Sequence, residues 1–206
     1  MHLRELFLRE DDRSTAVFAF GRFNPPTIGH EKLIQKVQSV ASKMNGKGYV
    51  FLSHSERTEK DPIDFQTKLS YLRQHFQADK NLSFGDTRAN TIIKVMKVLE
   101  AEGRTKIIMI AGDDRVMQFN NLLNQYNGKP TKTGNIEYTF DSIEVVSAGQ
   151  RDPDADDVTG VSASKARELA MKGQEHEFSK IIMGGDKGKV LYDKIQDQFG
   201  KTVDEN

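Results

Sequence analysis

Short apolar runs alternate with longer amphipathic segments along most of the chain. A short apolar run with polar flanks is typical of a strand that is buried on both faces. The predicted strands are 16–20, 48–53, 82–84, 106–110 and 142–147. Between and after them, apolar residues recur at the three- and four-residue spacing of one helix face. The predicted helices are about 27–41, 65–76, 91–101, 114–126 and 162–172. This alternation predicts an α/β fold with a doubly wound, Rossmann-like parallel sheet.

A single domain accounts for the alternation, because no internal repeat or low-complexity linker divides the chain. We place this domain at residues 15–175, after an N-terminal segment of residues 1–14. Residues 176–206 are expected to form a short C-terminal helical appendage that packs on the domain. Residues 127–140 are rich in Gly, Thr and Lys, and we interpret them as an excursion that forms a hairpin.

Composition narrows the classes of function. The chain has 206 residues, with 30 Lys+Arg against 30 Asp+Glu, and this zero net charge argues against binding nucleic acid or an anionic membrane by bulk charge. The absence of cysteine excludes disulfides, thiolate catalysis and Cys-ligated zinc. No apolar run approaches the ~18 residues that span a bilayer. The start of the chain carries acidic residues where a signal peptide is apolar, so we expect a cytoplasmic protein.

The loop after the first predicted strand, residues 21–30, reads GRFNPPTIGH. Ligands of doubly wound sheets bind beyond the carboxyl ends of the strands, which makes this loop a candidate site. Gly21 lets the chain turn, and His30 falls in the first helical turn beside unpaired amides and the positive end of the helix dipole. An anion there would meet amides and imidazole together, within reach of Arg22. The alternative is a proline-stiffened turn with a surface histidine.

The loop after the last predicted strand offers a second set of polar residues, in VSASKAR at 161–167. Ser162 is a candidate N-cap, and Ser164, Lys165 and Arg167 follow in the first turn and a half. Cations at a helix N-terminus oppose the dipole, and a bound polyanion would offset that cost. The alternative is a capped helix with a solvated basic face.

These two motifs together resemble the cytidylyltransferase-like nucleotidyltransferase superfamily. Its first motif ends in H-x-G-H or T-x-G-H, and its late motif resembles I-S-S-T-x-x-R. The resemblance covers roughly residues 15–172 and implies the nucleotidyltransferase type of the Rossmann-like fold. The C-terminal residues Glu177-Phe178 and Leu191-Tyr192 resemble those of phage-type members.

The resemblance assigns roles to individual residues. His30 matches the second histidine, which is expected to contact the nucleotide phosphates, while Thr27 stands where many members have the first. Arg167 belongs to the late motif that is expected to hold the β- and γ-phosphates, in which Ala163 replaces a hydroxyl residue. The full set of expected nucleotide-binding residues is Gly21, Arg22, Phe23, Thr27, Gly29, His30, Gly112, Asp114, Ser162, Ser164, Lys165 and Arg167.

Two further loops fit this assignment. Gly112 and Asp114 lie in AGDDR after the fourth predicted strand, which resembles the family's G-x-D turn near the substrate or the ribose. An aspartate that caps the following helix is the alternative there. Cations near the second and third predicted strands are candidates for receiving the acceptor's phosphate, although each alone is also an ordinary surface charge. These residues are Arg57, Lys60, Lys68 and Arg88.

The implied reaction is transfer of AMP or CMP from ATP or CTP to a phosphorylated small molecule, with release of pyrophosphate. We expect His30, Lys68 and Arg167 to be catalytic by positioning and charge stabilisation, without a protein nucleophile. Mg²⁺ is expected to bridge phosphate oxygens with few protein ligands, so no residue is assigned to a metal site. The GRF opening resembles nicotinamide mononucleotide adenylyltransferases, but pantetheine phosphate, glycerol phosphate and sugar phosphates stay open as acceptors.

Two other readings of the chain are kept. In the first, the protein retains the fold as a catalytically silent nucleotide-binding or phage structural protein, because Thr27 and Ala163 depart from the family's motifs and abolish turnover. A nucleic-acid binder is disfavoured by the neutral charge, and no membrane partner is expected; a homo-oligomer stays open. If the enzyme hypothesis holds, Arg22, Lys165 and Arg167 converge in a local cationic pocket, near an acidic loop at 152–157.

Overall fold

The computed structural model describes residues 14–56, 58–149 and 162–204. The chain folds into two compact units. The sheet unit comprises Met1–Phe20, Leu33–Phe51 and Asp79–Gln150, and the helical unit comprises Gly21–Lys32, Leu52–Ala78 and Arg151–Asn206. The units therefore interleave along the sequence, because the chain passes from one to the other at several strand ends and loops.

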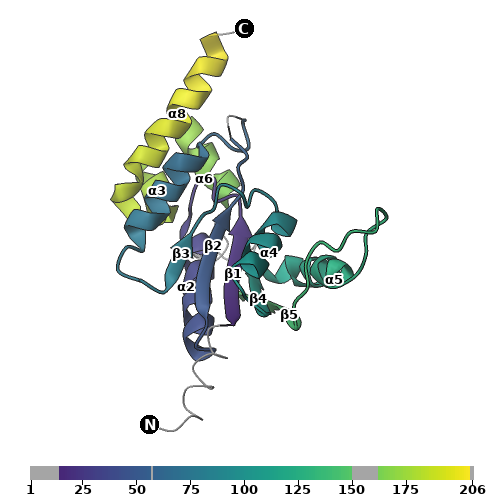
Figure 1. Ribbon diagram of the computed structural model, residues 1–206. Coiled ribbons are helices and arrows are strands. Elements are labelled where there is room, and N and C mark those ends of the chain that lie inside the picture. The colour runs from purple at the N-terminus through teal and green to yellow at the C-terminus, as the bar shows by residue number, and fades with distance from the viewer. Residues whose placement is uncertain (1–13, 57, 150–161, 205–206) are drawn as a thin grey trace. The chain divides into compact units, whose positions relative to one another are not determined.

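A five-stranded sheet forms the centre of the sheet unit. The strands are β1 (Thr15–Gly21), β2 (Lys47–Leu52), β3 (Leu82–Phe84), β4 (Lys106–Ala111) and β5 (Ser142–Ser147). They run in the order β3-β2-β1-β4-β5, with parallel pairing in β1–β4, β2–β3 and β4–β5 (Figure 1). The strand order reverses at the β1–β4 pair, as in a doubly wound sheet. All five predicted strands and the predicted fold class are confirmed.

Both faces of this sheet are covered. Alternate strand residues such as Phe18, Phe51 and Met109 form one core with apolar residues of α4 (Ile92–Ala101) and α5 (Val116–Tyr126). The opposite face packs against α2 (Ile28–Lys43): a Cβ on Gly48 of β2 would touch Val37 of this helix at 3.4 Å and would lie 2.9 Å from the Leu82 side chain. This double burial explains why β1, β2 and β4 are nearly continuous apolar runs, whereas the edge strand β5 carries Ser142 and Glu144 at exposed positions.

The hairpin expected at 127–140 is wrong. Within this segment, which the structure describes completely, the antiparallel pairing is limited to an isolated bridge between Pro130 and Ile136. The bridge is closed by the Thr131 N–H, which donates to the Asn135 carbonyl at 2.8 Å. The segment is held instead by Tyr138, which is buried and donates its hydroxyl to the Leu123 carbonyl at 2.8 Å.

The helical unit contains α3 (Phe65–His75), α6 (Ala163–Met171), α7 (Glu175–Ile181) and α8 (Lys189–Asp204), with a single 3₁₀ turn at Gly185–Gly188. The predicted C-terminal helices are thus present. The rings of Phe178 and Tyr192 pack edge to face at 5.3 Å and join α7 to α8. Tyr71 of α3 donates its hydroxyl to the main-chain carbonyl of Met183. None of the helices in the described part of the chain is long and apolar enough to cross a membrane.

Candidate functional site

The loop that follows β1 folds back over a buried aromatic ring. Phe23 is fully buried and has a positive φ of 49°, an uncommon conformation for a residue with a side chain. A Cβ on Gly21 would lie 3.1 Å from the Phe23 ring, so a glycine is needed at this close approach. The Phe23 ring lies against His30 with a centroid separation of 4.8 Å. The GRF sequence therefore builds a support for the imidazole.

Asn24 ties this loop to a second loop of the helical unit. Its buried side chain donates to the Ile63 carbonyl at 2.8 Å and accepts from the Ile63 N–H at 3.0 Å. The Asn24 side chain thus makes the two hydrogen bonds that a neighbouring strand would make, between segments 39 residues apart. Sequence reasoning missed Asn24, and the signal available was an amide side chain between a buried ring and two prolines.

The orientation of His30 follows from Thr27. The residue before α2, Thr27, is buried, and its N–H donates to Nδ1 of His30 at 3.0 Å. Its hydroxyl lies at the same distance from that nitrogen. Because an amide can only donate, Nδ1 must accept, and the proton of the neutral ring lies on Nε2. Thr27, expected to bind nucleotide itself, is placed here as the residue that orients the imidazole.

Two arginines from distant parts of the sequence meet beside this loop. Arg167 of α6 donates from Nη1 to the Asn24 carbonyl at 2.6 Å and from Nη2 to Oγ of Ser164 at 3.0 Å. Burial lowers the pKa of Arg167, the like charge of Arg22 lowers it further, and the carboxylate of Asp61 opposes both effects. Like charges held together in a protein favour a bound anion between them. The pair Arg22 and Arg167 therefore defines the candidate phosphate site.

Lys68 has partners that the sequence did not indicate. It is fully buried in α3, and its ammonium donates to the main-chain carbonyls of Arg22 at 3.1 Å, Ser53 at 3.1 Å and Ser55 at 3.3 Å. Burial lowers its pKa to about 8, against the opposing charges of Asp61 and two other carboxylates. The three donors of this ammonium are matched by three carbonyls from two loops.

The remaining predicted residues of the helical unit have local partners. Ser162 is the N-cap of α6, as expected, and accepts from the Lys165 N–H at 3.2 Å. The Lys165 ammonium forms an ion pair with Glu168 at 3.4 Å on the exposed face of α6. It therefore does not join Arg22 and Arg167 in the cationic pocket that the sequence predicted. Gly29 is half-buried at the second position of α2, and Lys60 is exposed. Arg57 and the acidic residues 152–157 lie outside the described residues.

Three predicted residues belong to the sheet unit. Gly112 precedes a single 3₁₀ turn at Asp113–Arg115, and a Cβ there would lie 2.9 Å from Oδ1 of Asp114. Neither aspartate caps a helix, so the capping alternative was wrong: Gly112 occupies the N-cap position, with no side-chain cap hydrogen bond. Arg88 forms a bidentate ion pair with Asp86, in which Nε donates to Oδ1 at 3.0 Å and Nη2 donates to Oδ2 at 2.6 Å. A phosphate would have to displace this carboxylate.

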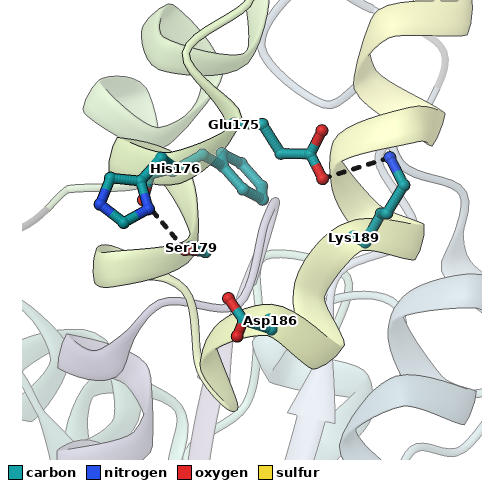
Figure 2. Close-up of a pocket in the computed structure, with 6 residues that line it drawn as sticks. Glu175, His176, Ser179, Asp186 and Lys189 are labelled. Atoms are coloured by element: carbon teal, nitrogen blue, oxygen red, sulfur yellow. Dashed lines mark hydrogen bonds and ion pairs between the residues drawn. The ribbon is translucent and has the colours of Figure 1, made fainter.

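A separate pocket of about 400 Å³ in the helical unit has the wrong charge for a polyphosphate (Figure 2). Buried Phe178 lines it, together with Asp186. The ammonium of Lys189 pairs with Glu175 at 3.2 Å and with Asp193 at 3.0 Å, so its charge is already matched. Among the residues that the structure describes, no group of three His, Cys, Asp or Glu side chains gathers as metal ligands.

Comparison with known proteins agrees with the fold. A family model described as cytidylyltransferase-like matches residues 18–169. Two solved structures of Plasmodium falciparum nicotinic acid mononucleotide adenylyltransferase share the fold. The first, complexed with APC, has a TM-score of 0.57 and 13% identity over 89% of this chain and 94% of that one. The second, complexed with NaAD, has a TM-score of 0.54 and 14% identity over 89% and 95%. No curated protein sequence matches the chain significantly.

Proposed function

Because the chain belongs to the cytidylyltransferase-like family, we propose that the site formed by Arg22, His30 and Arg167 binds the phosphates of ATP or CTP. Family membership confirms the nucleotidyltransferase activity predicted from the sequence. The observation that carries the site assignment is the position of Arg167, which donates from Nη1 to the Asn24 carbonyl at 2.6 Å, two residues from Arg22 in the same loop. Burial lowers the pKa of Arg167, and the like charge of Arg22 lowers it further. A polyphosphate is the ligand that relieves such repulsion.

The reaction is an in-line transfer. An oxygen of the acceptor's phosphate forms a bond to the α-phosphorus of the nucleotide, and the bond from that phosphorus to the pyrophosphate oxygen breaks. The electron pair leaves with pyrophosphate, so negative charge grows on the leaving group and on the α-phosphoryl oxygens. Positioning and charge stabilisation are enough to accelerate this step, and no protein nucleophile is required.

Each residue of the site supplies part of that stabilisation. His30 donates from Nε2 to an oxygen of the reacting phosphates, since Thr27 holds its other nitrogen as an acceptor. The first turn of α2 adds its N-terminal amides and the positive end of the helix dipole. Arg167 and Arg22 hold the leaving pyrophosphate, and Ser164 keeps the Arg167 fork in place.

Mg²⁺ fits this site as a partner of the nucleotide. The described residues gather no three ligands that could hold a metal. Mg²⁺ keeps most of its waters and binds phosphate oxygens, so the ion would come with the triphosphate and supply charge neutralisation. The protein's own contribution is the arginine pair and the oriented imidazole.

We favour a pyridine mononucleotide as the acceptor. The GRF opening of Gly21, Arg22 and Phe23 resembles nicotinamide mononucleotide adenylyltransferases. The two solved structures with the same fold are of a nicotinic acid mononucleotide adenylyltransferase, which supports this choice. In this scheme Lys60 and Arg57 receive the acceptor's phosphate. Arg88, Gly112 and Asp114 keep their predicted ligand-binding roles.

The other expectations from the sequence stay predictions. These are phage-type membership, a cytoplasmic location (host cytoplasm if the chain is phage-encoded), no nucleic-acid or membrane partner, and domain boundaries after residues 14 and 175. They rest on the sequence and on the resemblance stated above. A homo-oligomer stays open.

Pyrophosphate release tests the proposal. The enzyme is incubated with ATP or CTP, Mg²⁺ and one acceptor from a panel: nicotinic acid mononucleotide, nicotinamide mononucleotide, pantetheine phosphate, glycerol phosphate or a sugar phosphate. We expect release with a pyridine mononucleotide, and loss of that release in His30→Ala. His176→Ala is the matched control, because His176 is an exposed histidine of the same unit. Nucleotide binding without release for any acceptor would identify a silent binding or structural protein instead.

A further inference from the structure

A buried carboxylate stands among the cations of the candidate phosphate site. Asp61 is only 6% exposed, and its Oδ2 lies 3.8 Å from Nη1 of Arg22. Its other oxygen, Oδ1, is buried and has no hydrogen-bond partner among the described residues. A buried carboxylate oxygen without a donor costs free energy, so its presence in an anion site calls for a physical reason.

The backbone holds Asp61 firmly in this place. Its N–H donates to the Thr58 carbonyl at 3.0 Å and to the Thr58 hydroxyl at 3.1 Å, which closes a tight turn. Two residues further on, Ile63 is hydrogen-bonded to Asn24 of the loop after β1 (residues 21–30), which we call the phosphate loop. The carboxylate therefore does not reach the site by chance mobility of a surface loop.

Its electrostatic partners differ in their freedom to move. Asp61 raises the pKa of both Lys68 and Arg167, so it lies close enough to both to stabilise their charges. Lys68 is bound to three carbonyls and Arg167 to Asn24 and Ser164, so these two cations are fixed. The Arg22 side chain is 57% exposed, and its contact with Asp61 is longer than a hydrogen bond. Arg22 is therefore the cation that can exchange partners.

We infer that Asp61 is a resident counter-ion of the phosphate site, which holds Arg22 before nucleotide binds and competes with phosphate for it afterwards. This inference rests on the proposed function. Asp61 acts through Arg22 and so is a positioning residue. Its negative charge weakens the ground-state binding of triphosphate and pyrophosphate, which favours release of the pyrophosphate product.

Removing the charge of Asp61 tests the inference with inorganic pyrophosphate as the probe. Titration calorimetry compares the wild type with Asp61→Asn, a substitution of nearly equal volume. We expect pyrophosphate to bind about three- to fivefold more tightly to Asp61→Asn, which is the size of effect measured for exposed ion pairs. The gain shrinks as salt is raised, because salt screens the charge that was removed. In turnover, the KM for nucleotide falls while kcat does not rise.

Glu59→Gln is the matched control. It changes the net charge by the same amount, two residues away in the same loop, at an exposed position. We expect its pyrophosphate affinity to equal that of the wild type. Asp61→Ser, a smaller neutral residue, provides a second test if Asp61→Asn does not fold, as judged by its thermal melt. The gain should also disappear when Asp61→Asn is combined with Arg22→Gln.

The outcomes separate this inference from the proposed function. Pyrophosphate that binds the wild type, but binds both neutral variants with equal or lower affinity, overturns the counter-ion role alone. A gain that persists in the Arg22→Gln background overturns the action through Arg22. Failure of pyrophosphate and nucleotide to bind any of these proteins overturns the phosphate site itself, and the inference with it.

Discussion

Replacing Lys68 with methionine removes the ammonium that three main-chain carbonyls share, while nearly preserving the length and volume of the side chain. The carbonyls belong to Arg22, Ser53 and Ser55, so the substitution unties the phosphate loop from the loop after β2. The bond to Ser53 is buried, and leaving that carbonyl unpaired costs about 1–3 kcal/mol. The bonds to Arg22 and Ser55 are partly buried, so water replaces them at smaller cost.

The charge of Lys68 acts in the opposite direction, and its effect depends on pH. Burial lowers the pKa of Lys68 from 10.5 to about 8. Below pH 8 both the folded and the unfolded chain carry the proton, and the folded protein bears the whole cost of the buried charge. Between about pH 8 and 10.5 only the unfolded chain keeps it, so the stability of the wild type rises with pH in this window. The shift corresponds to about 3 kcal/mol.

The expected result is therefore a stability difference that changes with pH. At pH 7 the unpaired carbonyls and the relieved charge nearly cancel, and the variant's free energy of unfolding lies within about 2 kcal/mol of the wild type. From pH 8 to 10.5 the wild type gains on the variant by up to about 3 kcal/mol. Urea unfolding at several pH values measures this difference. Buried Tyr71, whose pKa is raised to about 12, titrates in both proteins and cancels.

Kinetics complete the test. A displaced phosphate loop misplaces Arg22, so kcat/KM for the nucleotide should fall at least about tenfold at pH 7.5. A lysine that binds the acceptor's phosphate directly, as the sequence suggested, would instead raise the KM for the acceptor and leave the nucleotide unaffected. A stability difference that is flat from pH 7 to 10, together with that acceptor-only effect, would refute the positioning role.

Three other substitutions probe the same site. His30→Ala should lower kcat by at least about a hundredfold while the protein still folds, and wild-type turnover would contradict the role of the imidazole. Arg167→Lys loses the fork that bonds the Asn24 carbonyl and Ser164, so we expect about a tenfold loss in nucleotide affinity by calorimetry; equal affinity would argue against a phosphate contact. Asn24→Leu leaves the N–H and carbonyl of Ile63 unpaired and should cost about 2–5 kcal/mol in urea unfolding, whereas a loss under 1 kcal/mol would show that water replaces them.

The threonine of the first motif supports turnover rather than a silent site. In the sequence, Thr27 looked like the loss of an imidazole that could bind the α-phosphate. In the structure its N–H and hydroxyl both face Nδ1 of His30, which directs the proton of the neutral ring to Nε2. Substituting Thr27 removes only the hydroxyl contact to His30, because the N–H that donates to Nδ1 belongs to the main chain.

Local pattern was sufficient for the strands and the motifs. A strand buried on both faces is apolar almost throughout, so β1, β2 and β4 can be identified before any neighbour is known, whereas the edge strand β5 carries an exposed Glu144. His30 and Arg167 were found because their motifs depend on short spacing at a helix start. The start of the helix at 114 was misplaced, because a 3₁₀ turn at Asp113–Arg115 precedes α5. The hairpin at 127–140 is reduced to the bridge between Pro130 and Ile136, and the buried Tyr138 is held by the Leu123 carbonyl, a contact that the local pattern does not contain.

Only the tertiary structure decided the roles of the groups that long-range contacts bury. Lys68, Asn24 and Asp61 look like ordinary polar residues in the sequence, and their bonds join segments dozens of residues apart, such as the 46 that separate Lys68 from Arg22. Burial makes each unpaired polar group costly, so the bonds of Lys68 and Asn24 and the charged neighbours of Asp61 depend on packing that no local window contains. The sequence by itself therefore determined the sheet and the two phosphate motifs, whereas the assembly of those motifs around a buried lysine, amide and carboxylate required the folded chain.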